Sequence, residues 1–347
     1  MRSEVTIGID LGGTKLAASV VDGRGRVSLL ERAPARLRGY DHALDAISGE
    51  VGRLRRRAAA RGQEVVAVGV AIAAFLDADR EVVRHAPNLG WRERPFRADL
   101  RDRLRLPVIV ENDADAAAWG EYCYGAGVGE RCLVLATVGT GLGGGIVAAG
   151  ALFRGGSGLG AEFGHLGVVP DGRPCPCGAR GCLEQYASGT ALARAARAAA
   201  AAEPAGRSRL LRSAGNDPER IDGPLVISLA RDGDPAALSA VEQIGGWLGR
   251  GLAQVAAVVD PSLVLVGGGL AEAGELFLAH ARGTFEANLS LRTARPVPPV
   301  RGAALGNTAG VVGAASLARA ARTDATSAIG ELGRVAIEPI PTRSGSV

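Results

Sequence analysis

The chain has 347 residues, of which 47% are hydrophobic and 22% charged, and this globular composition excludes a largely disordered protein. Forty basic residues nearly balance 36 acidic ones, so the net charge of +4 gives little support for binding to nucleic acid. The length is typical of two domains. Glycine is unusually frequent, with 51 residues, and this predicts many tight turns and close backbone contacts.

The sequence lacks the patterns typical of secretion or membrane insertion. Glu4 and Asp10 interrupt the first apolar stretch, and the longest apolar run, residues 65–76, is too short to cross a bilayer. We therefore expect a cytoplasmic protein that does not bind membranes. Three of the five cysteines lie between residues 175 and 182, which favours a metal site over disulfides.

Predicted strands alternate with predicted helices along the chain, a pattern that indicates an α/β fold with mixed sheets. Asp41 is expected to cap the first helix, residues 203–223 to form a surface loop, and residues 323–347 to form a tail. Strands are predicted at residues 5–9, 16–21, 26–33, 64–72, 107–110, 131–138, 143–149 and 263–266, and helices at 41–60, 114–124, 192–202, 235–259 and 309–320.

Three glycine turns directly follow apolar strands. They are Asp10-Leu-Gly-Gly-Thr14, Gly139-Thr-Gly141 and Gly267-Gly-Gly269. Each turn alone is equally well explained as a hairpin, but three together favour a nucleotide site, because bare backbone N–H groups bind phosphate. Asp10 stands at a strand end, where a carboxylate can hold Mg²⁺ through water. The first turn joins strand to strand, which argues against a simple dinucleotide-binding fold.

Three polar residues, Glu111, Asn112 and Asp113, follow a predicted buried strand. The carboxyl end of a strand is where α/β proteins bind ligands, and a carboxylate there can act as a general base. The same residues are also favoured helix caps, and without further evidence the cap is the better interpretation.

The most specific signal is a group of one histidine and three cysteines. His165, Cys175, Cys177 and Cys182 form a Cys₃His set, which is a closed composition typical of structural zinc and unsuited to hydrolytic metal chemistry. Glu162 and Glu184 flank this set, where they could either recognise sugar hydroxyls or belong to a solvated face.

These motifs together resemble the ROK family of sugar kinases and repressors, over about residues 5–320, and they are most similar to actinobacterial-type ATP-dependent glucokinases. The resemblance is carried by Asp10-Leu-Gly-Gly-Thr14, Ala86-Pro-Asn-Leu-x-Trp91, Glu111-Asn-Asp-Ala-Asp115, Thr140-Gly-Leu-Gly-Gly-Gly145, Glu162-x-Gly-His165, Cys175-x-Cys177-Gly-x-x-Gly-Cys182-x-Glu184 and Glu184-Gln-Tyr-Ala-Ser-Gly189.

The resemblance implies the actin-like, ribonuclease-H-like ATPase fold, with two α/β lobes and a nucleotide–sugar cleft between them. Residues 1–112 and 311–322 would form the small lobe. Residues 113–310 would form the large lobe, with a zinc-binding loop at 165–182. A homodimer or homotetramer is also implied.

Site roles are carried over residue by residue, for a kinase that uses ATP, catalytic Mg²⁺ and structural Zn²⁺. Asp113 would be the catalytic base for glucose or a related hexose, and His165 would bind both zinc and sugar. The sugar would contact Asn112, Asp113, Glu162, His165 and Glu184. The phosphates and adenosine would be held by Asp10, Gly12, Gly13, Thr14, Thr140, Gly141, Gly267 and Gly268.

Three departures from the family pattern remain, and two alternative functions. The family usually has Asn where this chain has Asp115 and often has Gly within the segment Ala73-Ala74-Phe75, and the stretch Gly306-Asn-Thr-Ala-Gly310 matches the family only loosely. The sugar could instead be N-acetylglucosamine, N-acetylmannosamine, allose or fructose. A sugar-sensing repressor is disfavoured, because the nine residues before Asp10 leave no room for a helix-turn-helix domain.

Overall fold

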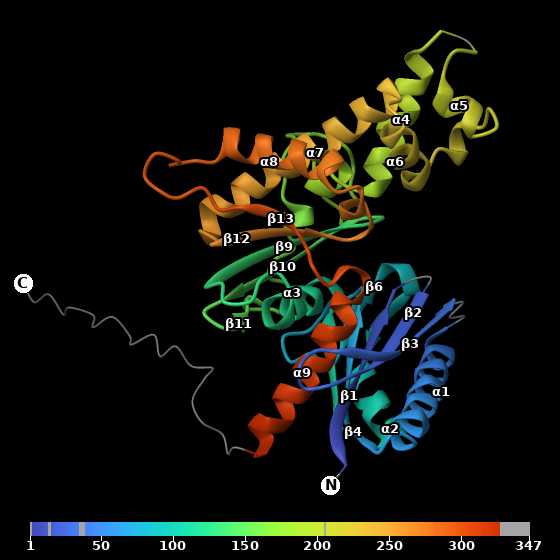
Figure 1. Ribbon diagram of the computed structural model, residues 1–347, viewed down its shortest axis with the longest axis vertical. Coiled ribbons are helices and arrows are strands. Elements are labelled where there is room, and N and C mark those ends of the chain that lie inside the picture. Colours follow the sequence, from blue (N-terminus) through green and yellow to red (C-terminus); the bar gives the residue numbers. More distant parts are fainter. Residues whose placement is uncertain (1, 13–14, 35–38, 205, 327–347) are drawn as a thin grey trace, which may run out of the picture.

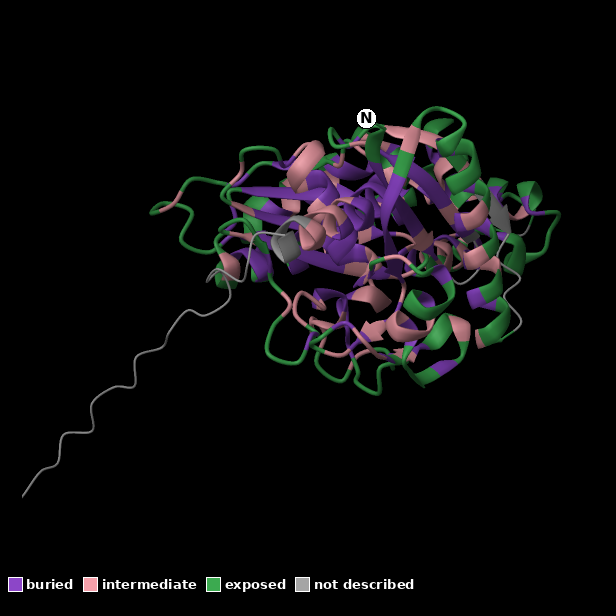
Figure 2. Cartoon of the chain, turned by 90° about the horizontal axis from the view of Figure 1, so that it is seen from below, coloured by how far each residue is buried: buried purple, intermediate pink, exposed green. Residues whose placement is uncertain are grey.

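The computed structural model describes residues 2–12, 15–34, 39–204 and 206–326, and it has two lobes, each built on a five-stranded sheet (Figure 1). The expectations for Gly13, Thr14 and residues 327–347 therefore lie outside the described residues. Buried residues concentrate in the sheets and in the helices packed on them (Figure 2). Within the described ranges, no helix combines the length and hydrophobicity needed to cross a membrane.

The two sheets share one plan, in which an antiparallel meander is joined to parallel strands. The first lobe has the order β3-β2-β1-β4-β8, where β4 and β8 run parallel to β1. The second lobe has the order β11-β10-β9-β12-β13, where β12 and β13 run parallel to β9. The strands are β1(Ser3–Leu11), β2(Lys15–Val21), β3(Val27–Pro34), β4(Gln63–Ile72), β8(Val108–Asn112), β9(Cys132–Val138), β10(Leu142–Ala148), β11(Ala151–Leu152), β12(Leu263–Gly267) and β13(Val300–Gly302).

Helices cover these sheets and explain why the central strands are almost continuously apolar. In the first lobe, β4 contacts α1 and also α9, so this parallel strand is buried on both faces. Helix α3 packs on α9 and on β10 and so lies where the lobes meet (Figure 1). The helices are α1(Tyr40–Ala59), α2(Phe96–Leu104), α3(Asp113–Tyr124), α4(Gly189–Ala202), α5(Arg209–Ser213), α6(Gly223–Arg231), α7(Pro235–Val259), α8(Glu275–Asn288) and α9(Ala309–Thr326).

A small third sheet extends the first lobe towards the second. It has the order β5-β6-β7, with strands β5(Phe75–Leu76), β6(Val83–Ala86) and β7(Trp91–Arg94). The ring of Trp91 packs against Tyr40 and Phe96, with ring centroids 5.0 and 5.4 Å away, and this attaches the sheet to α1 and α2. The loop between β5 and β6 is thereby placed close to the end of β8.

The high glycine content has a structural cause at the contact of α9 with its neighbours. A β-carbon on Gly69 of β4 would lie 1.9 Å from the carbonyl oxygen of Ala314, and one on Gly313 would lie 1.7 Å from that of Ala116 on α3. Helix α9 therefore touches both β4 and α3 through backbone atoms, a separation that only glycine permits.

We expect Gly69→Ala to destabilise the protein by about 3 kcal/mol, the upper end of the usual cost of overpacking, because the obstructing atom belongs to the backbone and α9 must move. The measurement is the midpoint of urea unfolding, with the m-value checked for two-state behaviour. Gly49→Ala in α1 is the matched control, because Gly49 is exposed and its β-carbon would meet nothing within 4 Å. The control should be neutral or stabilising. Equal midpoints for the two variants would contradict the backbone contact.

Most of the predicted elements are present, and four expectations need correction. Asp41 does not cap α1: the helix begins at Tyr40, whose hydroxyl donates to Asp99 Oδ2 at 2.7 Å, and the capping position is Gly39. The expected loop at 203–223 contains the short helix α5. Helix α9 continues past residue 320 to Thr326. Helices α2, α6 and α8 were not predicted at all.

Candidate active site

The end of β8 and the start of α3 hold the central acidic group of the site. Asn112 is the N-cap of α3, and its side-chain oxygen accepts from the N–H groups of Ala114 and Asp115 at 2.8 and 3.1 Å. Its Nδ2 donates to the carbonyl of Ala74 at 3.3 Å. The cap thereby fixes Asp113 as the first helical residue, so the capping role and the proposed site role coexist in this segment.

Asp113 is a partly exposed carboxylate at the N-terminus of α3. Burial raises its pKa, and a hydrogen bond from the Ala114 N–H, 2.9 Å from Oδ1, acts in the opposite direction. A raised pKa makes the ionised form a stronger base, which suits a group that takes a proton from a hydroxyl.

A cavity of about 160 Å³ opens on one side of Asp113. Gly267 and Gly268, at the end of β12, line it together with Asp10 of β1. Burial, and next the charge of Asp113, raise the pKa of Asp10 to about 7. Gly306, Asn307 and Gly310 also line the cavity; sequence reasoning gave this stretch no role, although its repeated small residues were a usable signal. The arrangement suits a phosphate-bearing ligand whose charges are offset by a cation held near Asp10.

The turn between β9 and β10 contacts the start of α4 instead of lining this cavity. The Gly139 carbonyl accepts from Gly189 N–H at 2.7 Å, and the Thr140 carbonyl accepts from Thr190 Oγ1 at 2.8 Å. The Thr140 side chain is exposed. Gly12 lies at the end of β1, outside the cavity lining, and the neighbouring Gly13 and Thr14 are outside the described residues.

Glu184 is held against the same turn. Its Oε2 accepts from the Leu142 N–H at 3.0 Å, and a β-carbon on Gly141 would approach that oxygen to 2.4 Å. Gly141 therefore leaves room for a carboxylate, a role that differs from the phosphate contact expected of it. The bond fixes the carboxylate of Glu184 at the beginning of β10.

Glu162 is close enough to Asp113 and Glu184 for their charges to act on it. Burial, then the charge of Asp113 and then that of Glu184, together raise its pKa to about 7. The structure thus brings three of the predicted sugar ligands, Asp113, Glu162 and Glu184, into one acidic group. A neutral ligand with several hydroxyl groups suits such a site, because it can donate to each carboxylate.

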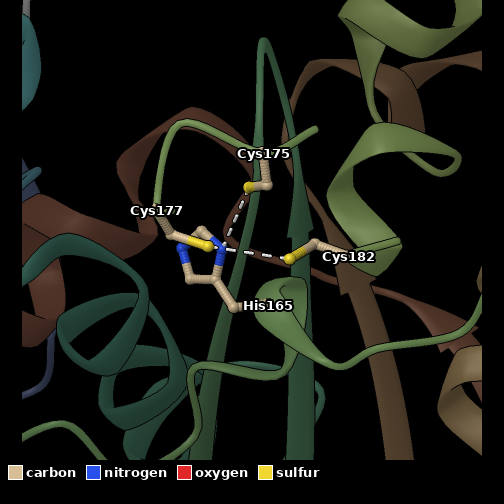
Figure 3. A group of neighbouring side chains, drawn as sticks. All are labelled: His165, Cys175, Cys177 and Cys182. Atoms are coloured by element: carbon tan, nitrogen blue, oxygen red, sulfur yellow. Dashed lines mark hydrogen bonds between the residues drawn. The ribbon is translucent and has the colours of Figure 1, made fainter. Parts of the chain in front are cut away.

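Figure 3 shows that the fourth predicted ligand, His165, points its ring at the three cysteines. Its Nδ1 lies 3.7 Å from Cys175 Sγ, and Cys177 Sγ lies 3.6 Å from Cys182 Sγ. All four donor atoms lie within 4.8 Å of one another. Tetrahedral Zn²⁺ with bonds near 2.3 Å separates its sulfur ligands by roughly 3.7 Å, so the set fits one zinc ion.

The segment from His165 to Cys182, called the cysteine loop here, also positions two of the predicted sugar ligands. The Leu183 N–H donates to the Leu166 carbonyl at 2.8 Å, which ties the segment after Cys182 to the segment after His165. His165 and Glu184 therefore depend on the same loop. The ring of Phe75, from the small third sheet, approaches the His165 ring with centroids 6.2 Å apart. Sequence reasoning did not identify this aromatic contact.

We expect the ligand-free protein to lose stability between about pH 4 and pH 8. The pKa values of Asp10 and Asp115, about 7 and about 8, exceed the ordinary value of 3.8. The folded state therefore binds these protons more tightly than the unfolded state, and the resulting stability is complete below pH 3.8 and lost as the pH rises through 7 and 8. Calorimetric Tm values across this pH range test the prediction. In Asp115→Asn protein, the fall of Tm at the upper end of the range should be smaller. A Tm that rises with pH here is the contrary result.

Comparison with known proteins gives concordant matches over nearly the whole chain. The sequence model of the ROK family matches residues 6–321. The glucokinase of Streptomyces coelicolor is 45% identical over 315 residues, covering 91% of this chain and 98% of that protein. The N-acetylmannosamine kinase of Escherichia coli is 33% identical over 308 residues, covering 86% and 97%.

A solved structure matches as well. It is the ROK family glucokinase from Streptomyces griseus in complex with glucose and AMPPNP, which superposes with a TM-score of 0.82 at 44% identity. The superposition covers 91% of this chain and 99% of that one. The two-lobed architecture of the chain is thus that of the actin-like ATPases.

Proposed function

The chain belongs to the ROK family, and on this basis we propose that it is a glucokinase, which transfers the γ-phosphoryl group of ATP to the 6-hydroxyl of glucose. A sugar kinase must align the attacking hydroxyl oxygen with the γ-phosphorus and its leaving oxygen, and must hold a general base within hydrogen-bond reach of that hydroxyl. The position of Asp113 supports its assignment as this base.

The observation that carries the proposal is the position of Asp113 between two different sites. Its charge raises the pKa of Asp10 in the small cavity, and it also raises the pKa of Glu162 beside the cysteine loop. Asp113 is therefore close to the glycine-lined cavity on one side and to the acidic sugar group on the other. A single carboxylate in this place can serve the nucleotide and the acceptor together.

The proposed reaction begins with Asp113 accepting the proton of the glucose 6-hydroxyl. The freed electron pair of that oxygen attacks the γ-phosphorus of ATP in line, and the bond to the β–γ bridging oxygen breaks to release ADP. Mg²⁺ bound with ATP supplies charge neutralisation at the phosphoryl oxygens. Asp10 would lie near the phosphates, and Gly267 and Gly268 would let the adenosine approach β12 closely.

Besides Asp113, we assign the recognition of glucose to four residues on both sides of the lobe contact. Glu162 and Glu184 would accept hydrogen bonds from sugar hydroxyls, and Asn112 would donate its second Nδ2 hydrogen. Zn²⁺ would supply a structural cross-link through His165, Cys175, Cys177 and Cys182. The His165 nitrogen that faces away from the cysteines would then meet the sugar.

We also retain the proposed boundaries and setting of the protein. The small lobe would comprise residues 1–112 and 311–322, and the large lobe residues 113–310. Because ATP and hexose phosphates are cytoplasmic metabolites, we place the reaction in the cytoplasm. A homodimer or homotetramer is proposed from the family resemblance, and light scattering after size exclusion tests it.

The decisive experiment is an ADP-release assay with Mg-ATP against glucose, mannose, allose, fructose, N-acetylglucosamine and N-acetylmannosamine. We expect glucose to give the highest kcat/KM, with phosphate on O6 as identified by ³¹P NMR. Asp113→Asn protein purified in parallel controls for contaminating kinases. A higher kcat/KM with an N-acetylhexosamine would reject glucose and keep a sugar kinase. Absence of turnover with every sugar would reject the kinase.

A further inference from the structure

A buried arginine joins the two segments that carry the sugar ligands. Arg80 lies in the loop between β5 and β6, and its side chain is only 8% exposed. Its Nε lies 2.7 Å from Glu111 Oε1, and its Nη2 lies 3.3 Å from Asp115 Oδ2. Both carboxylates belong to the segment that holds Asn112 and Asp113. Arg80 thus contacts this segment at Glu111 and Asp115, on both sides of Asp113 in the sequence.

The same guanidinium reaches the other lobe. Its Nη1 donates to the carbonyl of Gly158 at 2.7 Å, within the glycine-rich loop that leads from β11 to Glu162. A second arginine of that loop, Arg154, pairs with the other oxygen of Glu111 at 2.7 Å. We call Arg80, Glu111, Asp115, Arg154 and the Gly158 carbonyl the Arg80 clasp.

The chemistry of the clasp requires arginine. Four acceptors surround this side chain, namely the carboxylates of Glu111 and Asp115 and the carbonyls of Gly158 and Asp77, and only the planar guanidinium offers enough donors in fixed directions. A lysine would present one ammonium centre and would lose at least one of these contacts. The backbone of Arg80 has φ 58°, in the left-handed region, which indicates that the surroundings hold it there against its preference.

Arg80 and its two carboxylate partners are nearly enclosed, whereas Arg154 is 36% exposed. Glu111 is 1% and Asp115 4% exposed, and they face the two arginines. Burial, and next the charge of Glu111, raise the pKa of Asp115 to about 8. Enclosed ion pairs stabilise folds only weakly but do fix geometry, because each partner is costly to leave unpaired. A specific positioning role accounts for such an arrangement beside a site.

We propose that Arg80 is a positioning residue for the sugar, which holds the segment of Asn112 and Asp113 in register with the glycine-rich loop that ends at Glu162. The proposal rests on the sugar-kinase function proposed above. The sugar ligands come from separate segments, and Arg80 is bonded to two of these segments at once. Its removal would leave each ligand in place locally but misalign them relative to one another.

The first test compares Arg80→Lys with wild type. We expect KM for glucose to rise about tenfold and kcat to fall by a similar factor, with KM for ATP changed less than about twofold. Arg84→Met is the matched control, because Arg84 on the adjacent β6 is 56% exposed and pairs only with the exposed Glu93 among described residues. The control should have wild-type constants. A wild-type KM for glucose in correctly folded Arg80→Lys protein overturns the proposal.

The second test approaches the contact from the other lobe. A β-carbon on Gly158 would lie 2.8 Å from Arg80 Nη1 and 2.8 Å from the carbonyl oxygen of Asp77 in the same loop as Arg80, so Gly158→Ala should push this loop away and also raise KM for glucose. If both changes break the same contact, the double variant should be no worse than the more severe single variant. Independent, multiplying effects would show that the two residues act separately and would overturn the clasp.

Hydrogen exchange needs no enzymatic turnover, and it therefore tests the clasp independently of the proposed reaction. Hydrogen exchange of the ligand-free protein should be faster over residues 153–162 in Arg80→Lys and unchanged in Arg84→Met. Unchanged exchange in Arg80→Lys overturns the clasp. If wild-type protein is inactive with glucose, the proposed glucokinase function is wrong. The exchange rates of the ligand-free variants then still show whether Arg80 holds the two segments together.

Discussion

Asp113→Asn is expected to lower kcat for glucose phosphorylation by about 10²–10⁴, because the amide has no basic oxygen to accept the hydroxyl proton. Asparagine has nearly the same shape and is also tolerated at the start of a helix, so α3 and its cap should persist. Glucose should therefore still bind, as measured by calorimetry. Loss of turnover with retained binding locates the defect in the chemical step.

The control for this variant is Asp45→Asn, a change of the same kind on the exposed face of α1, where Asp45 pairs with Arg103. Asp45→Asn should leave kcat and the affinity for glucose at wild-type values. Turnover in Asp113→Asn above a few per cent of wild type would refute the assignment of the base. A pH profile of kcat/KM adds a second check, since activity should fall as the pH drops through the raised pKa of Asp113.

Cys177→Ser is expected to remove the metal and to raise KM for glucose about 10- to 100-fold, with a smaller effect on KM for ATP. The reason is positional: His165 belongs to the cysteine loop and Glu184 follows it, whereas the residues lining the small cavity come from other segments. Elemental analysis of wild-type protein purified without chelator should find about one zinc per chain.

Cys132→Ser is the matched control for the metal site, because Cys132 at the start of β9 lies outside the cysteine group. It should keep both zinc and KM. Wild-type protein free of zinc, or Cys177→Ser protein with an unchanged KM for glucose, would rule out the proposed dependence of the sugar site on the metal.

The sequence predicts well those parts of the fold whose signals are local. The strand at β4 and the helix α7 have clear apolar patterns, and the cysteine spacing indicates the metal group directly. Helix α8 was missed because its sequence, which contains Gly283 and Thr284, has only a weak apolar face. The predicted N-cap at Asp41 was wrong for another reason. Helix α1 begins one residue earlier, at Tyr40, whose hydroxyl bonds to Asp99 of α2, 59 residues along the chain, and such a distant contact leaves no local signal.

The candidate site was only partly predictable, because some of its contacts join segments that are distant in the sequence. Asn112, Asp113 and Glu162 stand in recognisable motifs, but Arg80 has no motif, and its role appears only when the loop before β6 meets the loop after β11. Gly141 illustrates the opposite case. Its motif predicts a phosphate contact, whereas the folded chain uses its missing β-carbon to admit the carboxylate of Glu184.

The backbone contact between α3 and α9 restricts how the two lobes can move. The absence of β-carbons at Gly120 and Gly313 lets the two backbones touch, and the indole of Trp119 donates to Ser316 Oγ across the same contact at 3.1 Å. Pulling the helices apart would lose the whole contact at once, whereas turning one against the other keeps most of it. We therefore expect any opening of the lobes to keep this contact and to proceed by rotation about it.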